Sequence, residues 1–170
     1  MKKLFALILA LCLMCSVALA ENAVSVSWED FAPVLEASGI TGDFYTFDAI
    51  SVAIFIPTGM VPAEVPDESY IGYFTAEDGS GEAIAVMYVN VEGMDLETYA
   101  AALEGVGATS IEMGYVNGLP CVSYEMPENG TLNVAFTTEA GYILEVVCGP
   151  LTTDEEKLGA SVILASIQSI

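Results

Sequence analysis

The chain of 170 residues contains no arginine and no histidine, and three lysines face 24 acidic residues. Without histidine, the Ser-His and Cys-His pairs of nucleophilic catalysis cannot form, and neither can a histidine-ligated metal site. Without a cluster of cations, a protein cannot displace the counterions of nucleic-acid phosphates. These absences predict no nucleic-acid binding, and they disfavour anionic membranes and phosphorylated ligands as partners.

The first segment has a basic start, an apolar run and a small-residue site, at Met1–Lys3, Leu4–Val17 and Ala18–Ala20. This order is typical of a secretory signal peptide. It predicts cleavage after Ala20 and leaves a single domain over residues 21–170. We therefore expect an exported protein, located outside the cell or in the cell envelope.

Two other fates of this segment remain open. Its apolar run is at the short end of what spans a bilayer, so the segment could stay as an anchor. Cys12 and Cys15 could carry a lipid. A lipidation signal needs a small residue directly before the cysteine, however, and here a large residue precedes each one.

Removal of the signal would leave Lys157 as the only cation beside all 24 acidic residues. Such a charge keeps an exported protein soluble and monomeric, which is the simplest interpretation. The alternative is calcium binding by carboxylates. The acidic turn at residues 77–82 supplies Asp78 and Glu82, which we predict as a weak cation site, although no EF-hand pattern is present. No other cofactor is expected.

The two cysteines of the mature chain, Cys121 and Cys148, are expected on strands that have one strand between them. Next-nearest strands lie about 9–10 Å apart, which exceeds the Cα separation that a disulfide can bridge. The sequence therefore predicts two buried free thiols.

Hydrophobic periodicity predicts helices over 31–37, 95–105 and 153–170, with strands joined mainly by hairpins. The expected strands cover residues 44–47, 50–57, 70–76, 83–91, 111–116, 119–125, 132–138 and 142–148.

Three local signals fix the ends of these elements. Asp95 is expected to cap the second helix, and Thr153 with Glu156 forms a capping box for the last one. Asn117-Gly118 is the strongest short signal for a two-residue hairpin turn.

Two predicted strands, 50–57 and 83–91, are apolar on both faces. A sheet face that is open to water would alternate with polar residues, so both faces must be covered, and the two long helices can cover them. We expect an α+β fold in which an antiparallel sheet of about 6–8 strands carries helices on both faces. The alternating strand 132–138 is expected near an edge.

Four segments carry a resemblance to a known fold: Ala53–Pro57, Asp95–Gly105, Asn117–Val122 and Ile163–Ile167. Their order resembles the Mog1/PsbP-like α/β/α sandwich, in particular small exported bacterial proteins of unassigned function, over roughly residues 42–170. The resemblance implies an accessory or binding protein rather than an enzyme. One kind of member helps to assemble the photosynthetic oxygen-evolving complex and another binds a small GTPase, but no functional residue of either maps onto this chain.

Two aromatic groups could bind a ligand. Trp28 stands beside Glu29, Asp30 and Phe31, and a second group combines Tyr70, Tyr73 and Phe74. The competing interpretation is that Trp28 fixes the first helix on the sheet and that the second group is core, and we favour it for both.

Glu112, Glu125 and Glu145 are expected on neighbouring strands. Two of them could form an acid–base pair of the glycosidase type, in which the more buried member would have a raised pKa. The alternative is three solvated side chains. Asn129–Thr131 matches a glycosylation acceptor, and is more simply a type I′ turn.

These observations favour a secreted, non-enzymatic binding or accessory module, monomeric, whose partner is an extracellular protein or a neutral or cationic ligand. A calcium-responsive extracellular protein is the first alternative, and a carboxylate-dependent glycan hydrolase is the second.

Overall fold

The computed structural model describes residues 24–89, 93–138 and 140–170. The predicted signal peptide, with Ala20, Cys12 and Cys15, lies outside these residues. Within them, no helix combines the length and the apolar character needed to cross a membrane.

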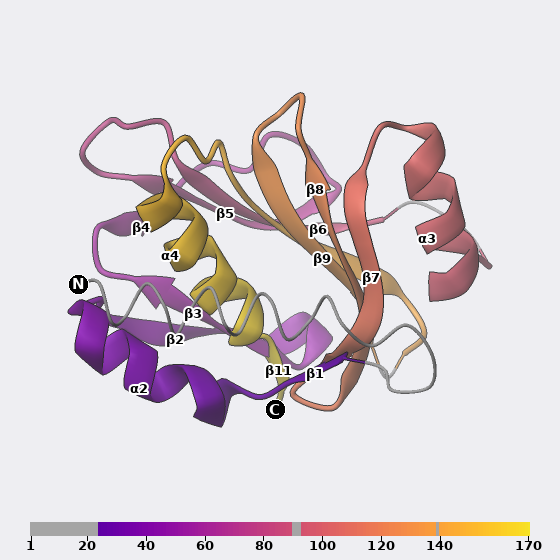
Figure 1. The fold of residues 1–170 in the computed structure, drawn as a ribbon, viewed down its shortest axis with the longest axis horizontal. Helices are drawn as coiled ribbons and strands as arrows, with labels where there is room; N and C mark the ends of the chain where they lie inside the picture. Colours follow the sequence, from indigo (N-terminus) through magenta and orange to yellow (C-terminus); the bar gives the residue numbers. More distant parts are fainter. Residues whose placement is uncertain (1–23, 90–92, 139) are drawn as a thin grey trace.

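Eight strands form the main sheet, in the spatial order β1-β7-β8-β9-β10-β6-β5-β4 (Figure 1). Their bounds are β1 Val24–Val26, β4 Met60–Pro62, β5 Tyr70–Ala76, β6 Ala83–Tyr88, β7 Thr109–Val116, β8 Leu119–Met126, β9 Thr131–Thr137 and β10 Ile143–Gly149. Neighbouring strands run antiparallel except β1 and β7, which pair in parallel. The expected antiparallel sheet is therefore confirmed for the hairpin strands, and β1 adds a parallel edge strand that was not predicted.

A second, smaller sheet has the order β11-β3-β2, with β2 at Gly42–Phe47, β3 at Val52–Pro57 and β11 at Gln168–Ser169. The prediction that β3 is a central strand of the main sheet is wrong. Its apolar faces have another cause, because Ile54 packs into the core beneath the main sheet while Phe55 packs against two helices.

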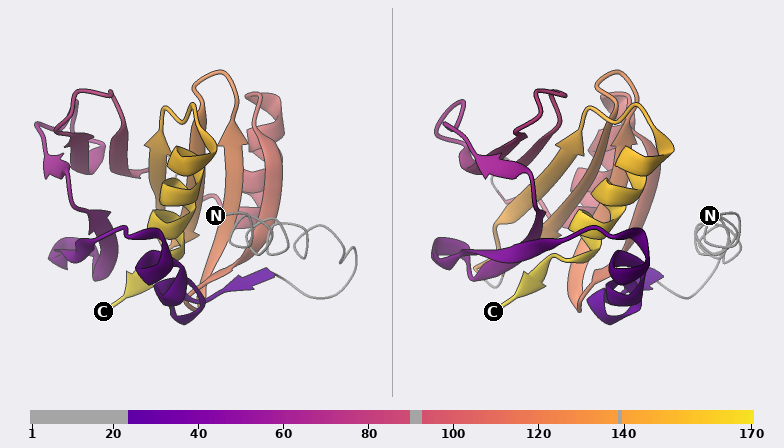
Figure 2. Two further views of the ribbon diagram at one scale, coloured as in Figure 1. Left: turned by 60° about the vertical axis from the view of Figure 1, so that its left-hand side comes forward. Right: turned by 90° about the vertical axis from the view of Figure 1, so that its left-hand side faces the viewer.

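Helices cover both faces of the main sheet, as predicted. Helix α4 (Asp154–Ala165) and the small sheet close one face, and α3 (Leu96–Gly105) packs on the other. Figure 2 shows α4, in yellow, and α3, in pink, on opposite sides of the strands. Helix α2 (Trp28–Ser38) packs against α4 and β3, and a short 3-10 helix, η1 (Asp48–Ile50), joins β2 to β3.

Both predicted helix caps form. Asp95 Oδ1 accepts from the Thr98 amide at 2.8 Å at the start of α3. Thr153 and Glu156 complete the capping box of α4. Helix α4 ends at Ala165 instead of continuing to the last residue, because residues 168–169 pair with β3 as β11.

Strand β9 lies between β8 and β10, so its predicted edge position is wrong. The misleading residue is Asn133, which is 2% exposed although it is polar. Its Nδ2 donates to the Tyr124 carbonyl at 3.3 Å and to Thr131 Oγ1 at 3.1 Å. A buried amide with these partners is compatible with a central strand.

Asn117 connects three parts of the fold. It and Gly118 have φ values of 48° and 84°, as the predicted type I′ turn requires. Its Oδ1 accepts from the Trp28 amide at 2.6 Å, and its Nδ2 donates at 2.8 Å to the carbonyls of Ala165 and Ile167. One side chain therefore joins the β7–β8 turn to the start of α2 and the end of α4.

The second predicted type I′ turn, at Asn129-Gly130, is wrong. Only Gly130, with φ of 65°, has the left-handed conformation, whereas a type I′ turn requires it at both central residues. Asn129 is exposed in the turn between β8 and β9.

Both cysteines are buried and free, with β9 between their strands. Burial raises the pKa of the Cys121 thiol to about 11 and that of Cys148 to about 12. The prediction of two buried free thiols is confirmed.

Candidate functional site

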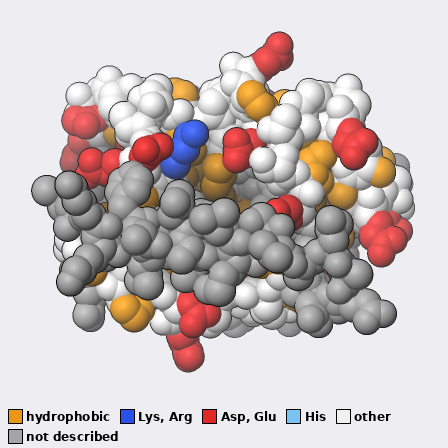
Figure 3. Space-filling model, viewed as in Figure 1, with side chains coloured by type: hydrophobic (Ala, Val, Ile, Leu, Met, Phe, Trp, Pro, Cys, Tyr) orange, Lys and Arg blue, Asp and Glu red, His pale blue; other side chains and the backbone are white. Residues whose placement is uncertain are grey.

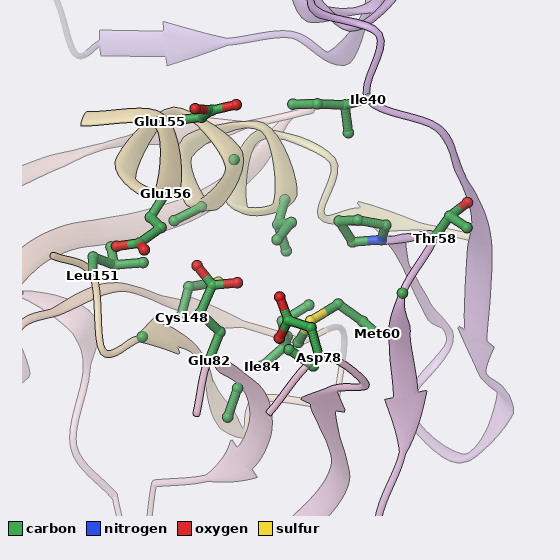
Figure 4. Close-up of a pocket in the computed structure, with 18 of the residues that line it drawn as sticks. Ile40, Thr58, Met60, Asp78, Glu82, Ile84, Cys148, Leu151, Glu155 and Glu156 are labelled. Carbon is green, nitrogen blue, oxygen red and sulfur yellow. The ribbon is translucent and has the colours of Figure 1, made fainter. Parts of the chain in front are cut away.

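A cleft of about 1000 Å³ lies where the small sheet, the β5–β6 turn, the end of β10 and α4 meet (Figure 4). Its volume is at the upper end of the range for small-molecule sites. We call it the acidic cleft because apolar and acidic side chains line it together and no basic residue does. The apolar ones include Ile40, Met60, Ile84, Leu151 and Ile163; the acidic ones are Glu77, Asp78, Glu82, Glu155 and Glu156.

Asp78 and Glu82, the predicted cation ligands, face this cleft together. Figure 4 shows their carboxylates pointing into the same space. Asp78 Oδ1 accepts from the Ser80 amide at 2.9 Å, and the hydrogen bonds of Ser80 lower the pKa of Asp78. Partial burial raises the pKa of Glu82, and the charges of Glu156 and Asp78 raise it further. The carboxylates of Asp78, Glu82 and Glu156 therefore lie close enough in the cleft to repel one another.

The carboxylate of Glu156 is held by the start of α4. It accepts hydrogen bonds from the amides of Thr152 and Thr153, the second at 2.8 Å, and from Thr152 Oγ1 at 2.9 Å. These bonds lower the pKa of Glu156, the Thr152 amide having the largest effect. Glu156 therefore contributes a fixed negative charge to the cleft, whereas Glu155 projects from the other side of the helix (Figure 4).

The described ranges contain no group of three or more acidic, cysteine or histidine side chains placed to hold a metal ion. Calcium takes 6–8 oxygen ligands, often several from carboxylates. Asp78 and Glu82 lie in one cleft, but two carboxylates alone do not form such a shell. Calcium binding at this pair stays a prediction.

The three glutamates from which a hydrolytic pair was predicted are divided between the two faces of the sheet. Glu112 pairs with Ser123, and Ser123 and Glu125 alternate with the residues of β8 that face α3, so both glutamates face away from α3. Glu145 faces α3. Glu145 therefore cannot pair with either of the other two, and the predicted acid–base pair stays a prediction only for Glu112 and Glu125, which share a face.

Glu145 instead meets two phenols in a second cavity, of about 420 Å³, which we call the tyrosine cavity. The Tyr124 hydroxyl donates to Glu145 Oε1, and the Tyr99 and Tyr124 hydroxyl oxygens are 3.2 Å apart. Burial raises the pKa of Glu145, although the bond from Tyr124 partly offsets this. Burial and the adjacent Glu145 raise the pKa of Tyr124.

Sequence reasoning missed this cavity. Tyr99 and Tyr124 fall within a predicted helix and a predicted strand, and no functional role was assigned to either. The available signal was Glu145, an acid within the otherwise apolar strand Ile143–Gly149, whose burial requires a hydrogen-bond donor from a neighbouring element.

The aromatic groups are mainly packing residues. The Trp28 ring lies 5.2 Å from the ring of Phe44 and 5.5 Å from that of Phe55, which fixes α2 on the small sheet as predicted. Phe74 is core, 2% exposed. A register shift between Tyr70 and Gly72 places Tyr70 and Tyr73 on the other face, where their rings are 6.0 Å apart, and Tyr70 lines the tyrosine cavity.

No protein-family model and no curated protein matches this sequence. Among solved structures, the chain is similar to the cyanobacterial PsbP (CyanoP) of Synechocystis, with a TM-score of 0.55 and 10% identity over 75% of this chain and 92% of that one. At this identity the likeness shows the fold alone, and it confirms the PsbP-like fold expected from the sequence.

Two structures of Mog1 are also similar. The Saccharomyces cerevisiae Ran-binding protein Mog1p has a TM-score of 0.40 and 16% identity, and a Mog1 mutant has 0.42 and 15%; each comparison covers 76% of this chain and 96% of Mog1. Scores at this level add no functional argument.

Proposed function

We propose that this protein is an exported, non-enzymatic binding or accessory module whose acidic cleft receives a cationic, partly apolar segment of an extracellular partner protein. The observation that carries the proposal is the composition of the cleft. Apolar side chains lie beside the carboxylates of Asp78, Glu82 and Glu156, and no basic residue lines the cleft.

Electrostatics favour a cationic occupant. Glu82 is partly buried and is repelled by Asp78 and Glu156, so its charged form is disfavoured in the empty cleft. A bound ammonium or guanidinium group would offset that repulsion. The excess of 24 acidic residues over three lysines would also speed the encounter with a basic partner.

The apolar residues favour an occupant larger than a bare ion. Met60, Ile84 and Leu151 offer apolar surface that would contact carbon atoms of the ligand (Figure 4). A peptide segment that alternates basic and apolar residues fits both parts of the cleft. The first 20 residues favour a location of this module outside the cell.

The test is a calorimetric titration of the mature protein with a peptide of alternating Lys and Leu, and with the same peptide carrying Glu in place of Lys. We expect only the cationic peptide to bind. The double variant Asp78→Asn/Glu82→Gln should weaken that binding by about tenfold or more, because it removes two charges near the ligand. Added salt should weaken it further.

The control is the double variant Glu97→Gln/Glu104→Gln, which removes the same charge from α3, far from the cleft lining. It should bind nearly as tightly as the unmodified protein. Equal losses in both double variants would mean that net charge rather than the cleft binds the peptide, and the proposal would fail.

Calcium response is the second candidate, and the shared orientation of Asp78 and Glu82 favours it. A ligand that binds only the folded state must raise the melting temperature. Millimolar calcium should therefore raise that of the unmodified protein and not that of Asp78→Asn/Glu82→Gln. An unchanged midpoint would remove this candidate.

A further inference from the structure

The sheet face under α3 is covered by that helix only in part. Helix α3 contacts β7, β8 and β9, and the sheet continues beyond them through β10, β6 and β5. The tyrosine cavity lies at this transition, lined by residues of α3 and of the strands beyond it. The register places Glu145 of β10 beside Met87 of β6, and Met87 beside Tyr70 of β5.

Side chains of β8 and β10 meet across β9. On its other side Glu145 pairs with the small Ala135 of β9, while Tyr124 of β8 pairs with Asn133, two residues away along β9, so the Tyr124 phenol reaches Glu145 diagonally across that strand. Tyr124 donates to Glu145 Oε1, and Tyr99 of α3 contacts Tyr124 in turn. Two uncharged phenols thus orient the carboxylate without neutralising it.

Glu145 has no cationic partner in the described ranges. No basic residue lines its cavity. Lys157, the only basic residue in the described ranges, belongs to α4 on the opposite face of the sheet, where it is the one blue side chain in Figure 3. Within the described residues, Glu145 Oε2 accepts no hydrogen bond. Every side-chain polar atom that is fully shielded from solvent in these residues does have a hydrogen-bond partner. Oε2 is therefore accessible from the cavity.

We infer that the tyrosine cavity binds a small organic ammonium ion, with Glu145 as the counter-charge and with tyrosine rings and methionine side chains as the walls. Tyr70, Tyr99 and Tyr124 can present electron-rich rings to a cation. Met87, Met94 and Met126 supply flexible, polarisable thioethers that adapt to an alkyl group.

The size and place of the cavity separate this site from the acidic cleft. A volume of about 420 Å³ suits a small molecule and is less than half that of the cleft. The two sites lie on opposite faces of the main sheet. Variants at Glu145 and at Asp78 with Glu82 should therefore affect different ligands, and either proposal can fail without the other.

The test uses choline and its uncharged isostere, in which a tert-butyl group replaces the trimethylammonium group. Each is titrated into the mature protein by calorimetry at neutral pH. We expect choline to bind at least about tenfold more tightly than the isostere, because a charged, partly desolvated contact is worth more than the same apolar area. The isosteric variant Glu145→Gln should weaken choline binding by about ten- to hundredfold and leave the isostere unaffected.

Two further variants keep the result interpretable. Glu112→Gln, on the opposite face, should bind choline as the unmodified protein does. Tyr70→Leu removes a ring and should weaken choline about threefold while changing the isostere little. The inference is overturned if choline does not bind at millimolar concentration, if it binds no better than the isostere, or if a folded Glu145→Gln protein binds it unchanged.

Discussion

The two faces of the main sheet use the same strands in different ways. On the α4 face, the buried core side chains of these strands are Cys121 of β8, Val134 and Phe136 of β9, and Leu144, Val146 and Cys148 of β10, and α4 with the small sheet closes over them. On the α3 face, alternate residues of the same strands include Tyr124, Asn133 and Glu145. Because side chains alternate along a strand, one segment can stabilise the fold on one side and present polar chemistry on the other.

The comparison predicts the largest loss of stability on the closed face. Phe136 of β9 is fully buried in the core, so Phe136→Ala should lower the free energy of unfolding by about 3–5 kcal/mol. Met87→Ala, on the half-open face, should cost clearly less because Met87 is only partly buried. Urea denaturation of both variants measures the difference, and equal costs would contradict the distinction between the faces.

The next effect concerns the Asn117 side chain, which joins the β7–β8 turn to α2 and α4. Asn117→Ala removes three hydrogen bonds and places alanine at a φ of 48°, so we expect a loss of about 2–3 kcal/mol. Asn129→Ala, at an exposed turn, is the matched control and should change stability by less than about 0.5 kcal/mol. Similar losses in thermal unfolding would contradict the role assigned to the hydrogen bonds and the left-handed conformation of Asn117.

A smaller effect compares two helix caps. Thr153 accepts from the Glu156 amide at 3.2 Å, so Thr153→Ala should destabilise the protein by about 1 kcal/mol. Ser27 precedes α2 without a side-chain hydrogen bond to the helix, so Ser27→Ala should have little effect. A larger loss at Ser27 in chemical denaturation would contradict this ranking.

The smallest effect is a pH dependence that belongs to the α3 face. A glutamate with a pKa raised in the folded state binds more protons when folded, so its contribution to stability increases as pH falls from neutral through that raised pKa. Glu145→Gln should therefore be slightly more stable than the unmodified protein at pH 7, by about 1 kcal/mol or less, and this advantage should shrink toward acidic pH. Melting curves across that range measure it, and an advantage that grows on acidification would contradict the sign.

Much of the fold follows from local sequence signals. Asp95, the Thr153–Glu156 capping box and the Asn117-Gly118 turn each produce the predicted feature, because caps and tight turns depend on a few adjacent residues. Double-sided apolar strands correctly predicted helices on both faces. The same pattern did not reveal that β3 belongs to the small sheet, because a strand buried between two layers is apolar on both faces in either sheet.

The sites were less predictable because they depend on register. Asp78 and Glu82 are close in sequence, and local reasoning placed them together. The contact of Tyr124 with Glu145 runs diagonally across β9, so it depends on which residues of β8, β9 and β10 lie opposite one another. The polar residue Asn133 also led to the wrong prediction that β9 is an edge strand. The hydrogen bonds that allow its burial depend on the folded chain and cannot be inferred from the sequence.

The methionine methyl groups test the division between the two sites most directly. Met87, Met94 and Met126 line the tyrosine cavity, Met60 lines the acidic cleft, and Met113 lines neither. In a methyl NMR titration of the mature protein, choline should shift the first three signals and leave Met60 and Met113 in place, whereas the Lys-Leu peptide should shift Met60. Choline shifts at Met60, or no shifts at the three cavity methionines, would contradict the account.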